Sequence, residues 1–232
     1  MTNNPVLLLK CIARRIVYQI SYSPLFKRNS MDQFNKFYYN SGVWQRTLWF
    51  GTPVWKCPLD LWVYQEIIFK IKPDVIVESG TANGGSALFL ASMLDIINNG
   101  KIVTIDMQEN EGRPKHKRIK YLLGSSTSKE IVEEIKGLVN AEDRILVILD
   151  SDHRKEHVLS ELRIYGELVS KGSYIIVEDT NINGHPVNDD FGPGPMEAVE
   201  EFLLENKNFV VDTSKEKFYV TFNPKGYLRK IQ

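Results

Sequence analysis

The chain alternates between two hydrophobic patterns from Pro58 onward. One is a short apolar run, rich in β-branched residues and too short for a helix, which predicts a buried strand. We expect five such strands, at Asp74–Glu78, Lys101–Asp106, Ile119–Leu123, Arg144–Asp150 and Ser173–Asp179. The other pattern repeats apolar residues at helical spacing. It predicts helices at Pro58–Ile71, Ser86–Ile97, Ser128–Leu138 and Lys155–Ser170, and a last one from Pro195 to about Asn206.

Two further strands are predicted near the C-terminal end, at Phe209–Asp212 and Lys217–Phe222. The residues between them are too few for a crossover helix, so this pair must form an antiparallel hairpin. The rest of the chain alternates helix and strand without repeats or low-complexity segments. The pattern therefore predicts one α/β domain whose mostly parallel sheet ends in an antiparallel hairpin.

The N-terminal segment predicts an amphipathic helix, because Leu9, Ile12, Ile16 and Ile20 follow helical spacing. Cations inside the apolar stretch exclude both a membrane span and a secretory signal. No acidic residue precedes Asp32, and the basic residues there are Lys10, Arg14, Arg15, Lys27 and Arg28. Such a helix suits an anionic membrane surface. The alternative is a helix that packs on its own domain or on a second subunit.

The composition of the chain argues against two classes of protein: general nucleic-acid binders and proteins built on disulfides or cysteine-bound zinc. Lys plus Arg and Asp plus Glu both number 29, and a net charge of +0 argues against generic nucleic-acid binding. Cys11 and Cys57 show no CxxC or Cys/His ligand spacing, which excludes a disulfide framework and a zinc finger. We expect both thiols to be small buried hydrophobes in a reducing compartment, and hence a cytoplasmic protein.

The loop from Ser79 to Gly85 is rich in glycine, follows a strand and opens a helix, so its N–H groups can face a polar cofactor. Its spacing fits a dinucleotide fingerprint or the Glu-x-Gly-x-x-x-Gly pattern of methyltransferases. Asp106, which ends the next strand, suits the ribose hydroxyls of either cofactor. Glu78 favours the amino acid end of S-adenosylmethionine, since an acid there would repel a pyrophosphate. An NAD-dependent oxidoreductase remains the first alternative.

Acidic residues end two strands that we expect to be neighbours: Asp150 and Asp152 at one, Glu178 and Asp179 at the other. Gathered carboxylates repel one another unless protons or a cation compensate, and oxygen ligands suit Mg²⁺ or a similar ion. The alternative is that the first two cap the following helix and the others are solvated. His153 lies beside this cluster as a helix-start residue or a participant. His185 could reach the same rim or belong to a turn.

Four stretches carry a family resemblance: Pro58-Leu-Asp60, Lys72-Pro-Asp-Val-Ile-Val-Glu-Ser-Gly80 with Gly84-Gly-Ser86, Leu149-Asp-Ser-Asp-His153, and Val177-Glu-Asp-Thr-Asn-Ile-Asn-Gly-His-Pro186. From about Trp55 to Phe222 the chain resembles the cephalosporin hydroxylase and rhamnosyl O-methyltransferase family. The resemblance implies a Rossmann-like class I methyltransferase fold, with seven strands of which one terminal strand is antiparallel. It implies metal-dependent transfer of a methyl group from S-adenosylmethionine to a hydroxyl of a sugar or glycosylated product.

The resemblance also implies a metal held by Asp150, Glu178 and Asp179, with Asp152 an open alternative to Asp150. For the base that takes the proton from the acceptor hydroxyl we expect Asp152 or His153. The expected cofactor-binding residues are Glu78, Gly80, Thr81, Gly84, Ser86, Asp106, Ser125 and Asp150. These positions define one predicted active site at the carboxyl edge of the sheet.

The domain organisation follows from where the resemblance begins. We expect residues 1–50 to be a helical extension and residues 51–232 to be the methyltransferase domain. Expected partners are a small-molecule or glycan acceptor and a second copy of the chain, with no nucleic acid. The N-terminal helix leaves open a contact with the inner face of a membrane, and a non-catalytic membrane-associated protein is the second alternative function.

Overall fold

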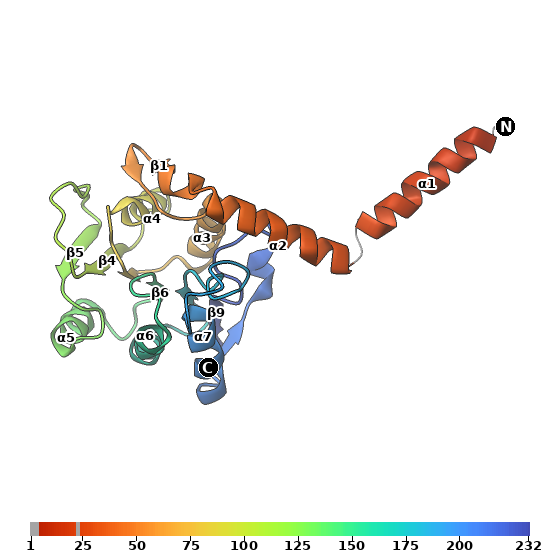
Figure 1. Cartoon of the computed structure of the whole chain (residues 1–232). Helices are drawn as coiled ribbons and strands as arrows, with labels where there is room; N and C mark the ends of the chain where they lie inside the picture. Colours follow the sequence, from red (N-terminus) through yellow and green to blue (C-terminus); the bar gives the residue numbers. More distant parts are fainter. Residues whose placement is uncertain (1–4, 22–23) are drawn as a thin grey trace.

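The computed structural model describes the backbone of residues 5–21 and 24–232, and the side chains of residues 9–17 and 28–232. Its centre is a seven-stranded sheet in the order β5-β4-β3-β6-β7-β9-β8 (Figure 1). The strands are β3 (Val75–Ser79), β4 (Lys101–Asp106), β5 (Ile119–Leu123), β6 (Ile145–Leu149), β7 (Tyr174–Val177), β8 (Phe209–Val211) and β9 (Tyr227–Lys230). Strand β9 is antiparallel to both of its neighbours, and the other described pairs in this sheet are parallel.

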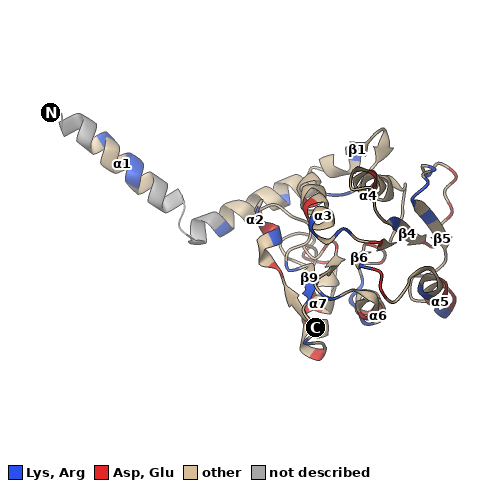
Figure 2. Ribbon diagram, turned by 180° about the vertical axis from the view of Figure 1, so that it is seen from behind, with Lys and Arg blue, Asp and Glu red and all other residues tan. Residues whose placement is uncertain are grey.

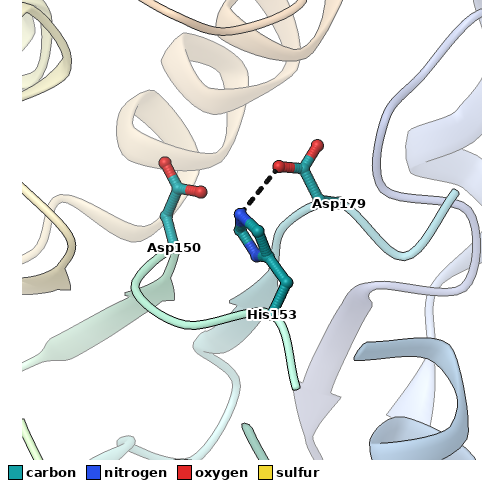
Figure 3. Close-up of side chains that lie close together, drawn as sticks. All are labelled: Asp150, His153 and Asp179. Atoms are coloured by element: carbon teal, nitrogen blue, oxygen red, sulfur yellow. Dashed lines mark ion pairs between the residues drawn. The ribbon is translucent and has the colours of Figure 1, made fainter. Parts of the chain in front are cut away.

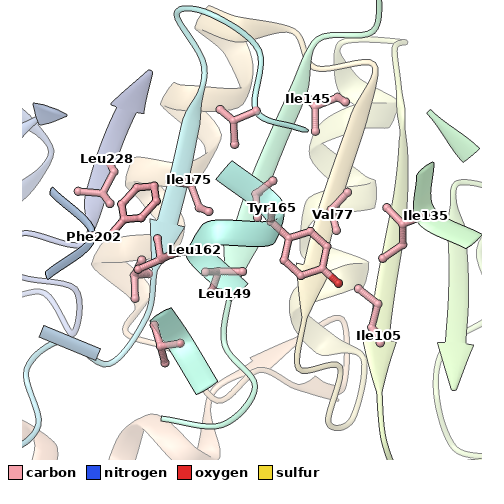
Figure 4. Close-up of a cluster of buried hydrophobic side chains, with 14 of the residues drawn as sticks. Val77, Ile105, Ile135, Ile145, Leu149, Leu162, Tyr165, Ile175, Phe202 and Leu228 are labelled. Carbon is pink, nitrogen blue, oxygen red and sulfur yellow. The ribbon is translucent and has the colours of Figure 1, made fainter. Parts of the chain in front are cut away.

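Helices cover both faces of the sheet. On one face lie α3 (Pro58–Ile71) and α4 (Gly85–Ile96), and on the other lie α5 (Lys129–Leu138), α6 (Lys155–Leu168) and α7 (Pro195–Glu205). Every residue of β3, β6 and β7 is buried, as expected of parallel strands between two helical layers. The larger core cluster packs the α5–α7 face against the sheet, with Leu162, Tyr165 and Phe202 over Val77 and Ile175 (Figure 4).

The strand order places the loops that matter for function. The chain runs outward from β3 to β4 and β5, then returns to lay β6 on the other side of β3. Connections leaving β3 and β6 therefore diverge, and ligands bind in the crevice at such a switch point. The loops after Ser79 and Leu149 begin side by side there, since these residues are partners in the β3–β6 register.

The predicted elements between Pro58 and Glu205 are confirmed, with ends that shift by a few residues. The predicted final strand at Lys217–Phe222 is wrong. That run lies in a loop, and the strand that pairs with β8 comes later, as β9. Phe222 is buried by aromatic contacts with Tyr38, Tyr39 and Trp44, so its apolar character reflects loop packing rather than a strand.

Two helices, α1 (Pro5–Ser21) and α2 (Pro24–Asn40), precede the domain. Helix α2, η1 (Val43–Arg46) and the small hairpin of β1 (Leu48–Trp49) and β2 (Thr52–Pro53) were not expected. The C-terminal half of α2 packs on the domain through Tyr38 and Tyr39, whereas α1 projects away from it (Figure 1). No helix of the described residues is long and apolar enough to span a membrane.

The described side chains of α1, residues 9–17, are all exposed. They include Leu9, Ile12 and Ile16, which lie at helical spacing within α1 as predicted; the side chains of Ile20 and Lys27 lie outside the described residues. The prediction that both cysteines are buried is half wrong. Cys57 is buried at the start of α3, whereas Cys11 is exposed because α1 has no described neighbour over that stretch.

Candidate active site

A pocket of about 630 Å³ opens at the carboxyl edge of the sheet, at the switch point between β3 and β6. Its walls come from the loops after β3, β4, β5, β6 and β7, from η1 and the segment before α3, and from the first residues of α4 and α6. The predicted residues that line it are Gly80, Thr81, Ser86, Asp106, Ser125, Asp150, Asp152, His153 and Asp179. The topology thus brings the glycine loop and most of the acidic cluster into one cavity.

Two glycines allow the loop after β3 to sit this close to its neighbours. Gly80 has a φ of +88°, and a Cβ there would lie 1.9 Å from the carbonyl oxygen of Asp150. A Cβ on Gly85 would lie 2.0 Å from the carbonyl oxygen of Pro53. Only glycine fits either position. As a result, the N-terminal turn of α4 faces the pocket, where its free N–H groups favour a polar or anionic ligand group.

Glu78 and Gly84 do not reach the pocket wall, which differs from the expectation for both. Glu78 is fully buried, and its two carboxylate oxygens accept hydrogen bonds from Ser86 Oγ (2.5 Å) and Thr104 Oγ1 (2.7 Å). Burial raises the pKa of Glu78 to about 7, against the opposing charge of Lys56. Glu78 therefore supports the loop from beneath, by fixing the side chain of Ser86, which lines the pocket.

Asp106 ends β4 as expected and faces the glycine loop. Its Oδ2 accepts hydrogen bonds from the N–H groups of Thr81 (3.1 Å) and Ala82 (2.8 Å), and pairs with Arg113 at 3.1 Å. Arg113 also donates to the carbonyl of Ala82. The carboxylate is thus held at the rim of the pocket, where a ribose would meet it.

Asp150, His153 and Asp179 form the acidic cluster that the structure assembles (Figure 3). One ligand atom from each lies within 4.8 Å of the others, and His153 Nε2 is 3.2 Å from Asp179 Oδ2. Burial raises the pKa of both carboxyl groups, while Lys56 and His153 act in the opposite direction. Asp179 has a φ of +52°, an uncommon conformation for a non-glycine residue and one often found at functional sites.

Glu178 lies next to this cluster but faces a different pair of side chains. Its Oε1 accepts hydrogen bonds from Lys56 Nζ (2.5 Å) and Tyr64 Oη (2.6 Å). Lys56 also pairs with Asp150 Oδ2 at 2.6 Å, so it joins the acids at the ends of β6 and β7. Although burial lowers the pKa of Lys56, these carboxylates outweigh that effect and raise it well above its ordinary range. Lys56 therefore stays charged.

Two other predicted participants are directed elsewhere. Asp152 pairs with Arg154, which holds its pKa at about 2. Its Oδ1 also accepts from the N–H of Arg154, which precedes α6, so Asp152 stabilises the turn before that helix and does not cap the helix. His185 is 2.8 Å from Glu197, at the start of α7, and belongs to the loop rather than to the cluster.

Sequence reasoning missed Lys56, Tyr64 and a buried network under the loops after β5 and β6. Lys56 lies between Trp55 and Cys57, and a single lysine in an apolar stretch directly before a helix start was the available signal. In the network, Glu161 Oε1 accepts hydrogen bonds from Ser126 Oγ (2.5 Å) and Ser151 Oγ (2.8 Å). Two serines, from separate loops, carry no pattern that would reveal it.

The donor set of the cluster fits a divalent cation. Two carboxylates and an imidazole converge from the β6 and β7 loops, and a third carboxylate is adjacent. Oxygen donors of this kind suit Mg²⁺ or Mn²⁺. The arrangement can hold a hydroxyl-bearing substrate beside a basic group, within the same pocket as the glycine loop.

Comparison with known proteins identifies relatives over most of the chain. The family model described as rhamnosyl O-methyltransferase/CmcI matches residues 41–231. Rhamnosyl O-methyltransferase of Mycobacterium tuberculosis (strain ATCC 25618 / H37Rv) is 40% identical over 204 residues, which cover 85% of this chain and 83% of the relative.

Two solved structures of CmcI share the fold. The apo structure has a TM-score of 0.63 at 19% identity, and covers 81% of this chain and 77% of its own. A structure of CmcI with Mg and SAM has a TM-score of 0.60 at 18% identity, and the match covers 81% of this chain and 78% of the CmcI chain. These likenesses confirm the predicted methyltransferase fold with its seven-stranded sheet.

Proposed function

The chain belongs to the rhamnosyl O-methyltransferase/CmcI family, and on that premise we propose that it transfers a methyl group from S-adenosylmethionine to a sugar hydroxyl. The observation that carries the proposal is the shared pocket, in which the glycine loop and the acidic cluster lie at the same edge of the sheet. The name of the relative makes a rhamnosyl group the first acceptor to test. Nothing in these relatives supports an NAD-dependent oxidoreductase or a non-catalytic partner.

The cofactor would lie along the glycine loop. We assign Gly80, Thr81, Ser86 and Asp106 to this part of the pocket, with Ser125 and Asp150 closing it. When bound, S-adenosylmethionine supplies an electrophilic methyl group. The chain would supply alignment and the exclusion of water, which are the main requirements of an in-line attack.

The metal ligands we propose are Asp150, Glu178 and Asp179, as the family resemblance implies. Glu178 Oε1 accepts from Lys56 and Tyr64, and Lys56 also pairs with Asp150, so Glu178 is linked to the cluster through this lysine. A divalent cation bound there would supply Lewis acidity that lowers the pKa of a hydroxyl. The three acids would also position the acceptor against the cofactor.

His153 is the base that the geometry favours. It lies in the cluster with its Nε2 3.2 Å from Asp179, whereas Asp152 is paired with Arg154 and has a pKa of about 2. A carboxylate with so low a pKa is a poor proton acceptor at neutral pH, where an imidazole is well suited. We therefore propose that His153 takes the proton from the acceptor hydroxyl as it attacks the methyl group.

The test is labelled methyl transfer into a panel of rhamnosyl and other glycosides, with metal content measured in parallel. Asp179→Ala should abolish metal binding and turnover together. His153→Ala should lower turnover by about 10² to 10⁴ with the metal retained. Asp152→Asn should retain most of the activity. If Asp152→Asn instead loses more turnover than His153→Ala does, Asp152 is the base and His153 is not. Full activity after exhaustive chelation, with no metal detected, would refute the metal-dependent mechanism.

Cofactor binding can be tested separately by calorimetry. Asp106→Ala should weaken binding of S-adenosylmethionine by about tenfold or more without unfolding the protein, since its carboxylate would face the ribose at the rim. Glu109→Ala, an exposed acid on the loop after β4, is the matched control and should bind as the wild type does. A wild-type protein that binds NAD but not S-adenosylmethionine would disprove the cofactor assignment.

We further propose that α1 contacts an anionic membrane surface. One face of the helix carries the exposed apolar side chains of Leu9, Ile12 and Ile16. Its remaining sides carry Lys10, Arg14 and Arg15. Figure 2 shows the basic residues of α1 with no acidic residue among them. The five basic residues before Asp32 leave 24 basic against 29 acidic residues in the rest of the chain. An anionic membrane surface would therefore attract the basic helix and not the rest of the chain, which is net acidic.

Flotation with vesicles tests this contact. The protein should float with vesicles that contain phosphatidylserine and not with neutral ones, and Arg14→Glu with Arg15→Glu should abolish flotation. Lys70→Glu, an exposed charge reversal on α3, is the control and should float normally. If wild-type protein does not float but forms a dimer that Ile12→Asp dissociates, α1 instead packs on a second copy.

A further inference from the structure

A lysine lies inside the acidic part of the site. The Nζ atom of Lys56 is 2.6 Å from Asp150 Oδ2 and 2.5 Å from Glu178 Oε1, and the side chain is only 2% exposed. Burying an ammonium and two carboxylates is costly unless they pair, and removing one partner leaves an uncompensated buried charge. Lys56, Asp150 and Glu178 therefore form one ionic unit, which joins the segment just before α3 to the ends of β6 and β7.

Asp150 is shared between this ionic unit and the rest of the cluster. Its Oδ2 accepts from Lys56, and Figure 3 shows one of its carboxylate oxygens turned toward His153 and Asp179. The three carboxylates that we assign to the metal carry a charge of −3, which Lys56 reduces to −2. One divalent cation cancels that remaining charge.

We infer that Lys56 is the internal counter-ion of the metal site: it holds Asp150 and Glu178 together in the metal-free protein and weakens divalent-cation binding by repulsion. This inference rests on the proposed function, because it takes metal ligation by these acids as its starting point. Lys56 acts as a positioning residue, through the carboxylates. Its expected consequence is a site that folds without metal and binds the cation reversibly.

Lys56→Met separates this role from simple packing. The metal-free variant should melt well below the wild type, and saturating Mn²⁺ should recover most of that loss, because the cation replaces the missing positive charge. Mn²⁺ binding, followed by electron paramagnetic resonance, should tighten about tenfold. Lys230→Met is the matched control: it removes a partly buried lysine that donates to the carbonyl of Gly166, far along the chain from the site, and should leave Mn²⁺ affinity unchanged.

Two further variants keep the test decisive if Lys56→Met does not fold without metal. Lys56→Arg retains the charge, so its Mn²⁺ affinity should stay near that of the wild type. The double variant Lys56→Met with Glu178→Gln again leaves a charge of −2, from Asp150 and Asp179, and should melt near the wild type when metal-free.

The inference is overturned if the melting temperature of Lys56→Met lies equally far below that of the wild type with and without Mn²⁺. It is overturned as well if the variant binds Mn²⁺ no more tightly than the wild type does. It is also overturned if the double variant is as unstable as Lys56→Met alone. These outcomes leave the proposed function standing, since the wild type would still bind the cation. A wild-type protein that binds no Mn²⁺ would instead remove the metal-dependent function itself, and this inference with it.

Discussion

Asp60 is a buried acid that fixes the loop before β9 to the start of α3. It is 1% exposed, and it accepts hydrogen bonds from Thr221 Oγ1, Tyr227 Oη and the N–H of Phe222. Burial raises the pKa of Asp60 to about 7, although these three donors oppose the shift. A single side chain thus joins the start of α3 to the distant stretch 221–227, and its protonation is linked to folding.

Asp60 makes stability depend on pH in a predictable direction. Its pKa is about 7 in the folded protein and about 4 in the unfolded chain, so its contribution is complete below about pH 4 and is lost as the pH rises to about 7. Asp60→Asn should therefore flatten the fall in the free energy of unfolding over this range, as measured by urea titration at several pH values. Asp190→Asn, at an exposed position, should follow the wild-type profile.

Asp60→Ala tests the hydrogen bonds rather than the titration. It leaves two hydroxyls and one N–H without their acceptor in the core, which should cost about 3 kcal/mol or more at every pH. An Ala variant that is as stable as the Asn variant would mean that water replaces the carboxylate.

At the scale of elements, the loops after β5 and β6 are tied to α6 by Glu161. This side chain is fully buried, and its Oε1 accepts from Ser126 Oγ and Ser151 Oγ, one from each loop. His157, one turn earlier on α6, lies 3.4 Å from the same oxygen, and this contact raises the pKa of His157. Ser126 and Ser151 line the pocket together with His157, so α6 both contributes to the wall and holds the two loops that complete it.

Glu161→Ala should loosen both loops together. We expect a loss of about 2 to 4 kcal/mol in the free energy of unfolding, because buried hydroxyls lose their acceptor, and weaker cofactor binding by calorimetry. Glu167→Ala, on the exposed face of α6, is the control and should change neither. Normal cofactor affinity in Glu161→Ala would show that the pocket wall does not depend on this network.

The parallel core could be predicted from the sequence because burial between two helical layers leaves uninterrupted apolar runs, as at Ile145–Leu149 and Tyr174–Val177. The short strand β9, which lies between β7 and β8, could not, since only Tyr227 and Leu228 are buried in it and a longer apolar run precedes it. In the site, acids at strand ends were predictable from topology. The position of Lys56 was not, because the contacts of a side chain from outside the sheet depend on tertiary packing.

At the scale of the whole molecule, the extension and the domain meet at a small set of aromatic contacts. Phe222, 2% exposed, lies against Tyr38 and Tyr39 of α2 and against Trp44, and Asn188 donates to Tyr39 Oη. We expected the domain to begin near residue 51. These contacts favour a boundary near residue 30, because the second half of α2 covers a buried side chain of the domain.

Two truncations test that boundary. Deleting residues 1–30 should leave the melting temperature and cofactor binding close to those of the full chain, since the described side chains of α1 are exposed and the contacts with Phe222 remain. Deleting residues 1–40 should remove Tyr38 and Tyr39, expose Phe222 and cost about 3 to 5 kcal/mol, or about 10 °C in melting temperature. Tyr38→Ala with Tyr39→Ala in the full chain should reproduce most of this loss, which separates the aromatic contacts from the length of the helix. If the shorter deletion destabilises the protein as much as the longer one, α1 is part of the folded core and the boundary lies before it.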